Sequence, residues 1–139
     1  MIVAVGKMRD APLRAAADEY LGRVRRYVAC EEREARSADQ LERLVPAGAL
    51  RVALEVEGEQ LTSQGLAERI ERWSTRGKGV IAFLIGGAEG IPEETSAQAD
   101  VRLSLSKLTL PHRLARVLLA EQLYRSMTLL RGEPYARES

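Results

Sequence analysis

The sequence has few of the residues that build disulfides and metal centres. Cys30 is the only cysteine of the chain and His112 is its only histidine. A single cysteine excludes an internal disulfide and a multi-cysteine zinc site, and a single histidine argues against a histidine-based metal centre. We therefore expect a protein that binds no metal.

Long hydrophobic segments are also missing. No apolar run approaches the roughly 20 residues that a membrane-spanning helix needs. Residues 1–7, MIVAVGK, have the pattern of a strand and lack the basic region and cleavage site of a secretory signal. The sequence contains no repeat, linker or low-complexity tract. We expect a cytoplasmic protein with no membrane partner and a single domain over residues 1–139.

Positive charge is concentrated in the last third of the chain, although the net charge is only +1. Residues 102–139 carry seven basic and three acidic side chains, a net charge of +4. Residues 1–101 carry fourteen basic and seventeen acidic side chains, a net charge of −3. A basic C-terminal third fits an anionic partner such as RNA or a nucleotide, and it also fits an ordinary solvated surface. Charge alone leaves both readings open.

The apolar pattern alternates between the periods of strands and of helices. It predicts strands at residues 2–5, 51–56, 80–85 and 101–105. It predicts helices at residues 10–29, 37–44, 62–73, 92–99 and 112–130. Residues 80–85 are continuously apolar, as is typical of a parallel strand that is buried on both faces. We therefore predict an α/β fold with a mostly parallel sheet flanked by helices.

The final predicted helix, residues 112–130, is apolar around nearly its whole circumference. Such a helix must be covered on more than the side that faces the sheet. In a small domain, a second copy of the chain can supply the extra cover, which predicts a homodimer through this helix. The alternative is a central core helix within one subunit.

Two loops are candidates for binding a small molecule. The glycine loop, residues 86–90 (GGAEG), follows the strand at residues 80–85, at the edge where open α/β sheets bind ligands. Its glycine spacing differs from the dinucleotide fingerprint, and it is not followed by the phosphate-binding lysine of nucleoside triphosphatases. The second loop, residues 106–111 (SKLTLP), combines small hydroxyls, backbone amides and two leucines that suit an adenine ring. Taken singly, each loop also fits an ordinary structural turn or loop lining.

Taken together, the motifs of the C-terminal half resemble the RlmH family, small bacterial methyltransferases of the SPOUT class that act on large-subunit ribosomal RNA. The resemblance is carried by residues 84–90 (LIGGAEG), 105–112 (LSKLTLPH), 116–118 (RVL) and 121–125 (EQLYR). It extends over the whole chain, from residues 3–8 (VAVGKM) to Pro134 and Tyr135.

The resemblance implies a SPOUT-type fold with a C-terminal deep trefoil knot and a homodimer packed through the final helix. It implies S-adenosylmethionine as the methyl donor and 23S rRNA within the ribosome as the partner. The implied product is N3-methylated pseudouridine. The implied cofactor-binding residues are Leu54, Gly86, Leu105, Ser106, Lys107, Leu108, Thr109 and Leu110.

Candidate catalytic residues lie at and beyond the second loop. His112 is placed to orient the base or accept a proton, although a histidine at a helix start also serves for packing. Arg116 is a candidate for stabilising a developing oxyanion, and Tyr135 for contacting the base in the partner subunit's site. The candidate substrate-binding residues are Arg113, Arg125 and Arg137.

The tail departs from the family pattern, in which Pro-Tyr is commonly followed by histidine. This chain has Ala136 and Arg137 there, so no catalytic role for that histidine carries over. Two alternatives to the rRNA methyltransferase stay open. One is a SPOUT methyltransferase with a different RNA target, and the other is a non-catalytic dimeric module that binds an adenosine ligand or RNA.

Overall fold

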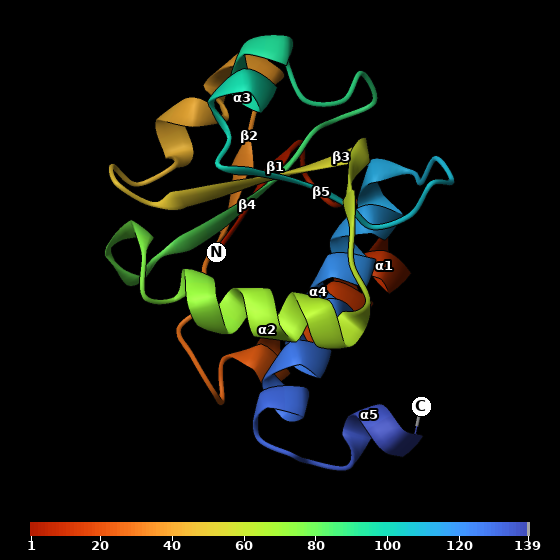
Figure 1. Cartoon of the computed structure of the whole chain (residues 1–139). Coiled ribbons are helices and arrows are strands. Elements are labelled where there is room, and N and C mark those ends of the chain that lie inside the picture. The colour runs from red at the N-terminus through yellow and green to blue at the C-terminus, as the bar shows by residue number, and fades with distance from the viewer. Residues whose placement is uncertain (139) are drawn as a thin grey trace.

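The computed structural model describes residues 1–138, with side chains through residue 136, as a five-stranded sheet with helices on both faces (Figure 1). The strands are β1 (Ile2–Val5), β2 (Glu32–Ala35), β3 (Leu50–Gln60), β4 (Ile81–Ile85) and β5 (Val101–Ser104). Their order in the sheet is β2-β1-β4-β3-β5, and every neighbouring pair is parallel. The prediction of a mostly parallel α/β fold is confirmed. The knot stays a prediction.

The segment between the first helix and β3 differs from the sequence prediction. Residues 32–35 form the edge strand β2, which the apolar pattern missed because its sequence is Glu-Arg-Glu-Ala. The helix predicted at residues 37–44 is instead two 3₁₀ turns, η1 (Ala38–Gln40) and η2 (Glu42–Leu44). The Ser37 hydroxyl donates to the Asp39 carboxylate and makes no capping bond to the backbone. No side-chain cap therefore starts a helix at Ser37, and the chain makes only two short 3₁₀ turns in this segment.

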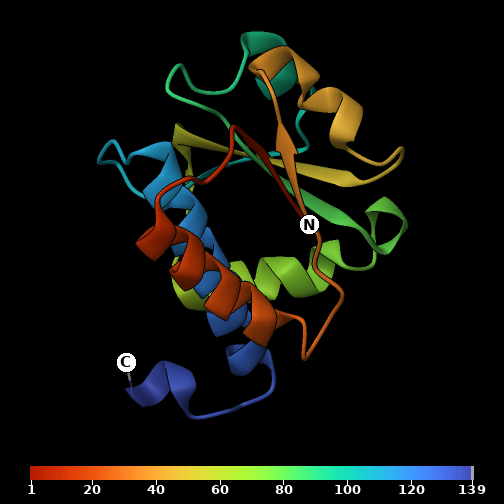
Figure 2. The same ribbon diagram turned by 180° about the vertical axis from the view of Figure 1, so that it is seen from behind.

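Three long helices cover one face of the sheet, and short elements cover the other (Figures 1 and 2). The long helices are α1 (Ala11–Val24), α2 (Ser63–Trp73) and α4 (His112–Leu130). The opposite face is covered by η1, η2 and α3 (Glu93–Gln98) (Figure 1). Two further short elements are the turn η3 (Gly77–Gly79) and the C-terminal α5 (Tyr135–Glu138), which follows α4. Asp10 caps α1 through the Leu13 amide, and Thr62 caps α2 through the Gly65 amide. The bounds of α4 match the prediction, whereas α1 ends five residues early, where turns begin at Arg25.

Helix α4 lies in the main core, between α1 and α2 (Figure 2). Its Leu119, Ala120 and Leu123 are at most 6% exposed and pack against the sheet side of the core. Part of the apolarity of α4 is therefore used within one subunit, as the alternative reading proposed. Leu114 and Leu118 of the same helix stay 36% and 37% exposed.

The long strand β3 bulges away from β5 in its middle. Leu54 and Glu59 both pair with Leu103, so residues 55–58 leave the ladder. Gly58 is required there, because a Cβ atom on it would lie 2.7 Å from the backbone of Leu103. The bulge carries residues 55–57 over the carboxyl edge of the sheet. No helix within residues 1–138 is long and apolar enough to cross a bilayer.

Candidate functional site

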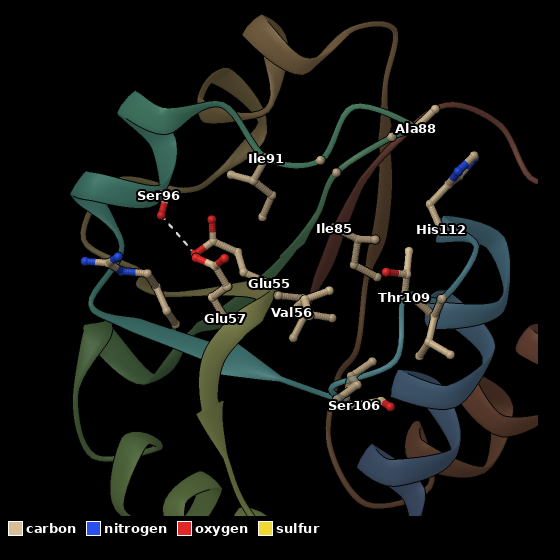
Figure 3. A pocket seen from close by; sticks show the side chains of 18 of the residues that line it. Glu55, Val56, Glu57, Ile85, Ala88, Ile91, Ser96, Ser106, Thr109 and His112 are labelled. Carbon is tan, nitrogen blue, oxygen red and sulfur yellow. Dashed lines mark hydrogen bonds between the residues drawn. The ribbon is translucent and has the colours of Figure 1, made fainter.

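A pocket lies at the carboxyl ends of β3, β4 and β5. It encloses about 520 Å³, within the range of small-molecule sites. The bulge of β3, the glycine loop and the second loop form its walls, and the first turn of α4 completes them. Figure 3 shows Glu55 and Glu57 on one side of this pocket, and Thr109 and His112 on the opposite side. The two loops singled out in the sequence thus line one cavity.

The glycine loop is closed by its own backbone. The Gly90 amide donates to the Gly87 carbonyl at 3.0 Å, and Gly90 has a φ of +79° that favours glycine. Gly86 is buried beneath this closure. A Cβ atom on Gly86 would lie 2.3 Å from the carbonyl carbon of Gly90, so no side chain fits at that position. The loop presents backbone to the pocket because its shape admits only glycine at its base.

The hydroxyls around the second loop bond within it. Ser104 Oγ donates to the Ser106 carbonyl at 2.9 Å, and Ser106 Oγ accepts from the Leu108 amide at 2.9 Å. These bonds fix the turn, as serine side chains often do in loops. The side chain of Leu108 is 74% exposed although it lines the pocket. An apolar side chain so exposed at a pocket mouth is available to a ligand or to a partner surface.

The structure brings most of the predicted cofactor residues together. Residues Leu54, Gly86, Leu105, Ser106, Leu108, Thr109 and Leu110 all line the pocket. Lys107 belongs to the same loop but is exposed and lies outside the lining. His112 lines the pocket from the first turn of α4.

Polar residues that sequence reasoning missed occupy the side formed by β3 and α3. Ser96 Oγ donates to Glu55 Oε2 at 2.9 Å, which ties α3 to the bulge of β3 (Figure 3). Glu57 and Arg102 line the same side. The position of Glu55 directly after Leu54, at the end of a predicted strand, was the available sequence signal for this wall.

Arg116 lies outside the pocket lining and is buried among carboxylates. It is 1% exposed, and its guanidinium bonds to the carboxylates of Glu32 at 2.8 Å and Glu34 at 2.7 Å. It also donates to the Gly6 carbonyl at 3.1 Å. Burial acts to raise the pKa of Glu34, but the bonds from Arg116 and the Met8 amide outweigh it and hold that pKa below its usual range. The described conformation does not direct Arg116 toward a substrate.

Tyr135 and Arg125 lie at the far end of α4 from the pocket. The Tyr135 hydroxyl donates to Glu121 Oε2 at 2.7 Å, and Arg125 pairs with the same carboxylate at 2.6 Å. Burial and the bond to Glu121 raise the pKa of Tyr135. The ring centroid of Tyr135 lies 4.5 Å from that of Tyr124, and the two ring planes are tilted by 57°. Tyr124 is twelve residues along α4 from His112 and hence about 18 Å away. Neither residue reaches the pocket of its own chain.

The remaining predicted substrate residues lie at the rim or outside the described side chains. Arg113 follows His112 and is exposed at the start of α4. The side chain of Arg137 lies outside the described residues. Within residues 1–138, no group of three histidine, cysteine, aspartate or glutamate side chains is arranged to hold a metal ion.

Fold and pocket define a class: α/β proteins with a cavity of small-molecule size at the carboxyl edge of a parallel sheet. A family profile described as "Predicted SPOUT methyltransferase" matches residues 1–136. The ribosomal RNA large subunit methyltransferase H of Sorangium cellulosum is 60% identical over 142 residues, which cover 98% of this chain and 97% of that protein. The protein of the same name from Anaeromyxobacter dehalogenans strain 2CP-1 is 46% identical, over 96% of each chain.

Two solved structures share the fold at 14% identity. A "probable methylase family protein" from Haemophilus influenzae superposes with a TM-score of 0.62 over 96% of this chain and 68% of that one. TrmJ from Z. mobilis superposes with a TM-score of 0.54 over 91% of this chain and 69% of that one. The chain belongs to the SPOUT methyltransferase family and, within it, to the ribosomal RNA large subunit methyltransferase H group. The resemblance drawn from the sequence motifs is thereby confirmed.

Proposed function

We propose that this protein transfers a methyl group from S-adenosylmethionine to N3 of a pseudouridine in 23S rRNA, on the assembled ribosome in the cytoplasm. One observation carries the proposal. The walls of a single pocket are built from Leu54, Gly86 and the second loop, in a chain that is 60% identical to an rRNA methyltransferase H. The motif residues and the cavity thus coincide.

The residues of the pocket fit such a donor. An adenine ring needs flat apolar surfaces and backbone hydrogen bonds at its edge, which Ile85, Leu105 and Leu110 and the loop amides can provide. The volume of about 520 Å³ suits a ligand of nucleoside size. When bound, the donor supplies an activated methyl group on a positively charged sulfur. The protein has to align that group with the base and exclude competing water.

The proton on N3 has to leave as the new N–C bond forms. His112 is half-buried in the first turn of α4 and lines the pocket, so its imidazole can orient the base or take this proton. Glu55 lines the same pocket but already accepts a bond from Ser96. We therefore favour His112 as the group that contacts the base.

We propose that two chains pack through α4. Leu114 and Leu118 are four residues apart on one face of this helix and are 36% and 37% exposed. Leu108 adds a further exposed apolar side chain at the pocket mouth. In such a dimer, Tyr135 can serve the pocket of the partner subunit, since it is too far from its own.

Exposed cations at the rim are candidates for holding the RNA backbone. Arg113 and Lys107 are exposed beside the pocket, and neither has an ion-pair partner among the described side chains. Unpaired cations next to a cavity favour phosphate groups. Arg125 is engaged by Glu121 in the described chain, so we assign it to the far end of the helix.

Turnover separates this function from that of a binding module. Ribosomes that lack the modification are incubated with the protein and methyl-labelled S-adenosylmethionine, and label in 23S rRNA at N3 of pseudouridine is the expected result. His112→Ala is expected to lose turnover while it keeps donor affinity in calorimetry. Donor binding without any label on ribosomes would instead support the non-catalytic module, and label on another RNA would support a different target.

A further inference from the structure

Two walls of the pocket, the glycine loop and the second loop, rest on the carboxyl end of β1. The glycine loop leans on Val5, because a Cβ atom on Gly87 would lie 3.2 Å from Val5 Cγ1. Helix α4, which continues the second loop, is tied to the next residue, Gly6, through the guanidinium of Arg116 at 3.1 Å. Two adjacent residues of β1 and its loop thus support the two loops that enclose the pocket.

Arg116 anchors the start of α4, and with it the second loop that leads into this helix. It lies one turn after His112, and its neighbour Ala115 lines the pocket. Since a helix is rigid over a single turn, the position of the guanidinium sets the position of His112 and of the loop that ends there. The side chain of Arg116 is 1% exposed and reaches from α4 to Glu32 of β2. It therefore contacts the sheet next to the pocket and does not line the cavity.

The carboxylates that hold Arg116 are shared with a second cation. Arg14 of α1 approaches Glu32 at 2.7 Å and Glu34 at 3.8 Å. Arg14 and Arg116 thus face Glu32 and Glu34 together, and Arg14 also pairs with the exposed Asp18 at 2.7 Å. Arg14 is bound to the same pair but belongs to a helix that does not line the pocket. This asymmetry makes Arg14 a matched control for Arg116.

We propose that Arg116 is a positioning residue, which holds His112 and the second loop at the distance from the glycine loop that the methyl donor needs. The identity of the ligand rests on the proposed function. The anchor itself rests on the bonds to Gly6, Glu32 and Glu34. It acts on the donor and on His112 only through α4, so its removal is expected to weaken donor binding strongly. Once saturating donor holds the second loop and His112 in place, kcat is expected to fall only slightly.

A first experiment needs no ligand. Hydrogen exchange is compared for the unsubstituted protein, Arg116→Met and Arg14→Met at a temperature where circular dichroism shows all three folded. Amides of residues 105–115 are expected to exchange about tenfold faster in Arg116→Met and at an unchanged rate in Arg14→Met. Equal protection of these amides in all three proteins would overturn the anchor. If Arg116→Met fails to fold, Arg116→Lys is measured in its place. Lysine keeps the positive charge but cannot bind several acceptors at once as the planar guanidinium does.

A second experiment distinguishes positioning from catalysis and from simple scaffolding. For Arg116→Met, the Kd of S-adenosylmethionine is expected to rise about tenfold, while kcat at saturating donor stays within about threefold. The Kd of Arg116→Lys is expected to lie between that of the unsubstituted protein and that of Arg116→Met. The Kd and kcat of Arg14→Met are expected to equal those of the unsubstituted protein. A fall in kcat with unchanged Kd would mean that Arg116 acts on the substrate, and a lower Tm with both constants unchanged would mean scaffolding alone. Absence of donor binding by the unsubstituted protein would refute the proposed function, while the exchange experiment still decides the anchor.

Discussion

The substitution Gly86→Ala tests how the glycine loop is built. The new Cβ atom would lie 2.3 Å and 2.5 Å from the carbonyl carbon and oxygen of Gly90, and 2.6 Å from the amide nitrogen of Ile91. Carbon atoms in contact normally stand about 3.5–4.0 Å apart, so the overlap exceeds 1 Å. The obstructing atoms are backbone and cannot rotate away. The loop has to open, and with it one wall of the pocket.

The magnitude follows from two opposing terms. Overpacking at a well-packed position costs about 1–3 kcal/mol, and a clash with backbone belongs at the upper end of that range. Replacing glycine by alanine returns about 0.4–1 kcal/mol by restricting the unfolded chain. The net loss is therefore about 2 kcal/mol. For 139 residues the unfolding entropy is about 0.3 kcal/mol/K, so Tm is expected to fall by about 7 °C.

The neighbouring glycine provides the control. A Cβ atom on Gly87 would meet only the side chain of Val5, at 3.2 Å and 3.5 Å, and that side chain can shift by a few tenths of an ångström. Gly87→Ala is expected to change stability by no more than about 0.5 kcal/mol. Thermal unfolding and calorimetry with S-adenosylmethionine are measured for both variants, and donor affinity is expected to fall about tenfold in Gly86→Ala alone. Equal Tm and equal affinity in the two variants would refute the steric reasoning.

Three further predictions concern charge, substrate and assembly. The pKa of Glu34 is lowered in the folded state, so its ion pairs add stability above the carboxylate's unfolded pKa of about 4.3, and this stability is lost as the pH falls through the folded value. Glu34→Gln is therefore expected to unfold more easily than the unsubstituted protein at pH 7 and equally easily near pH 2; an unchanged difference at both pH values would contradict the linkage. Arg113→Gln is expected to weaken ribosome or rRNA binding and to reduce the slope of log K against log salt concentration by about 0.7–0.9. Arg76→Gln, which lies exposed at the opposite edge of the sheet, is expected to leave affinity and slope unchanged. Equal effects of the two substitutions would show that Arg113 does not contact the RNA. Leu118→Glu places a charge on the exposed face of α4 and is expected to convert a dimer into a species of 15.4 kDa in sedimentation, whereas a 15.4 kDa species without any substitution would exclude the dimer.

Local sequence predicted the elements whose apolar pattern is complete. The strand β4 and the helix α4 were found with nearly their observed bounds. The strand β4 is apolar throughout, and α4 repeats apolar residues at helical spacing along its length. The edge strand β2 was missed, since it has one neighbour in the sheet and charged side chains that face Arg116 and Arg14. Its pairing with β1 depends on long-range contacts that no local pattern encodes.

Contiguous residues were enough to predict the parallel α/β class, the two loops of the pocket and the family, because glycine spacing and the composition of the second loop are local properties. The tertiary structure brings these loops together with Glu55 and His112 around one cavity, which no contiguous stretch of residues could show. It also separated the roles of the arginines. Arg113 is exposed at the rim, whereas Arg116, three residues later, is buried and bonded to β1 and β2. The direction in which a helical side chain points depends on what packs around the helix, and that is fixed only when distant segments of the chain meet.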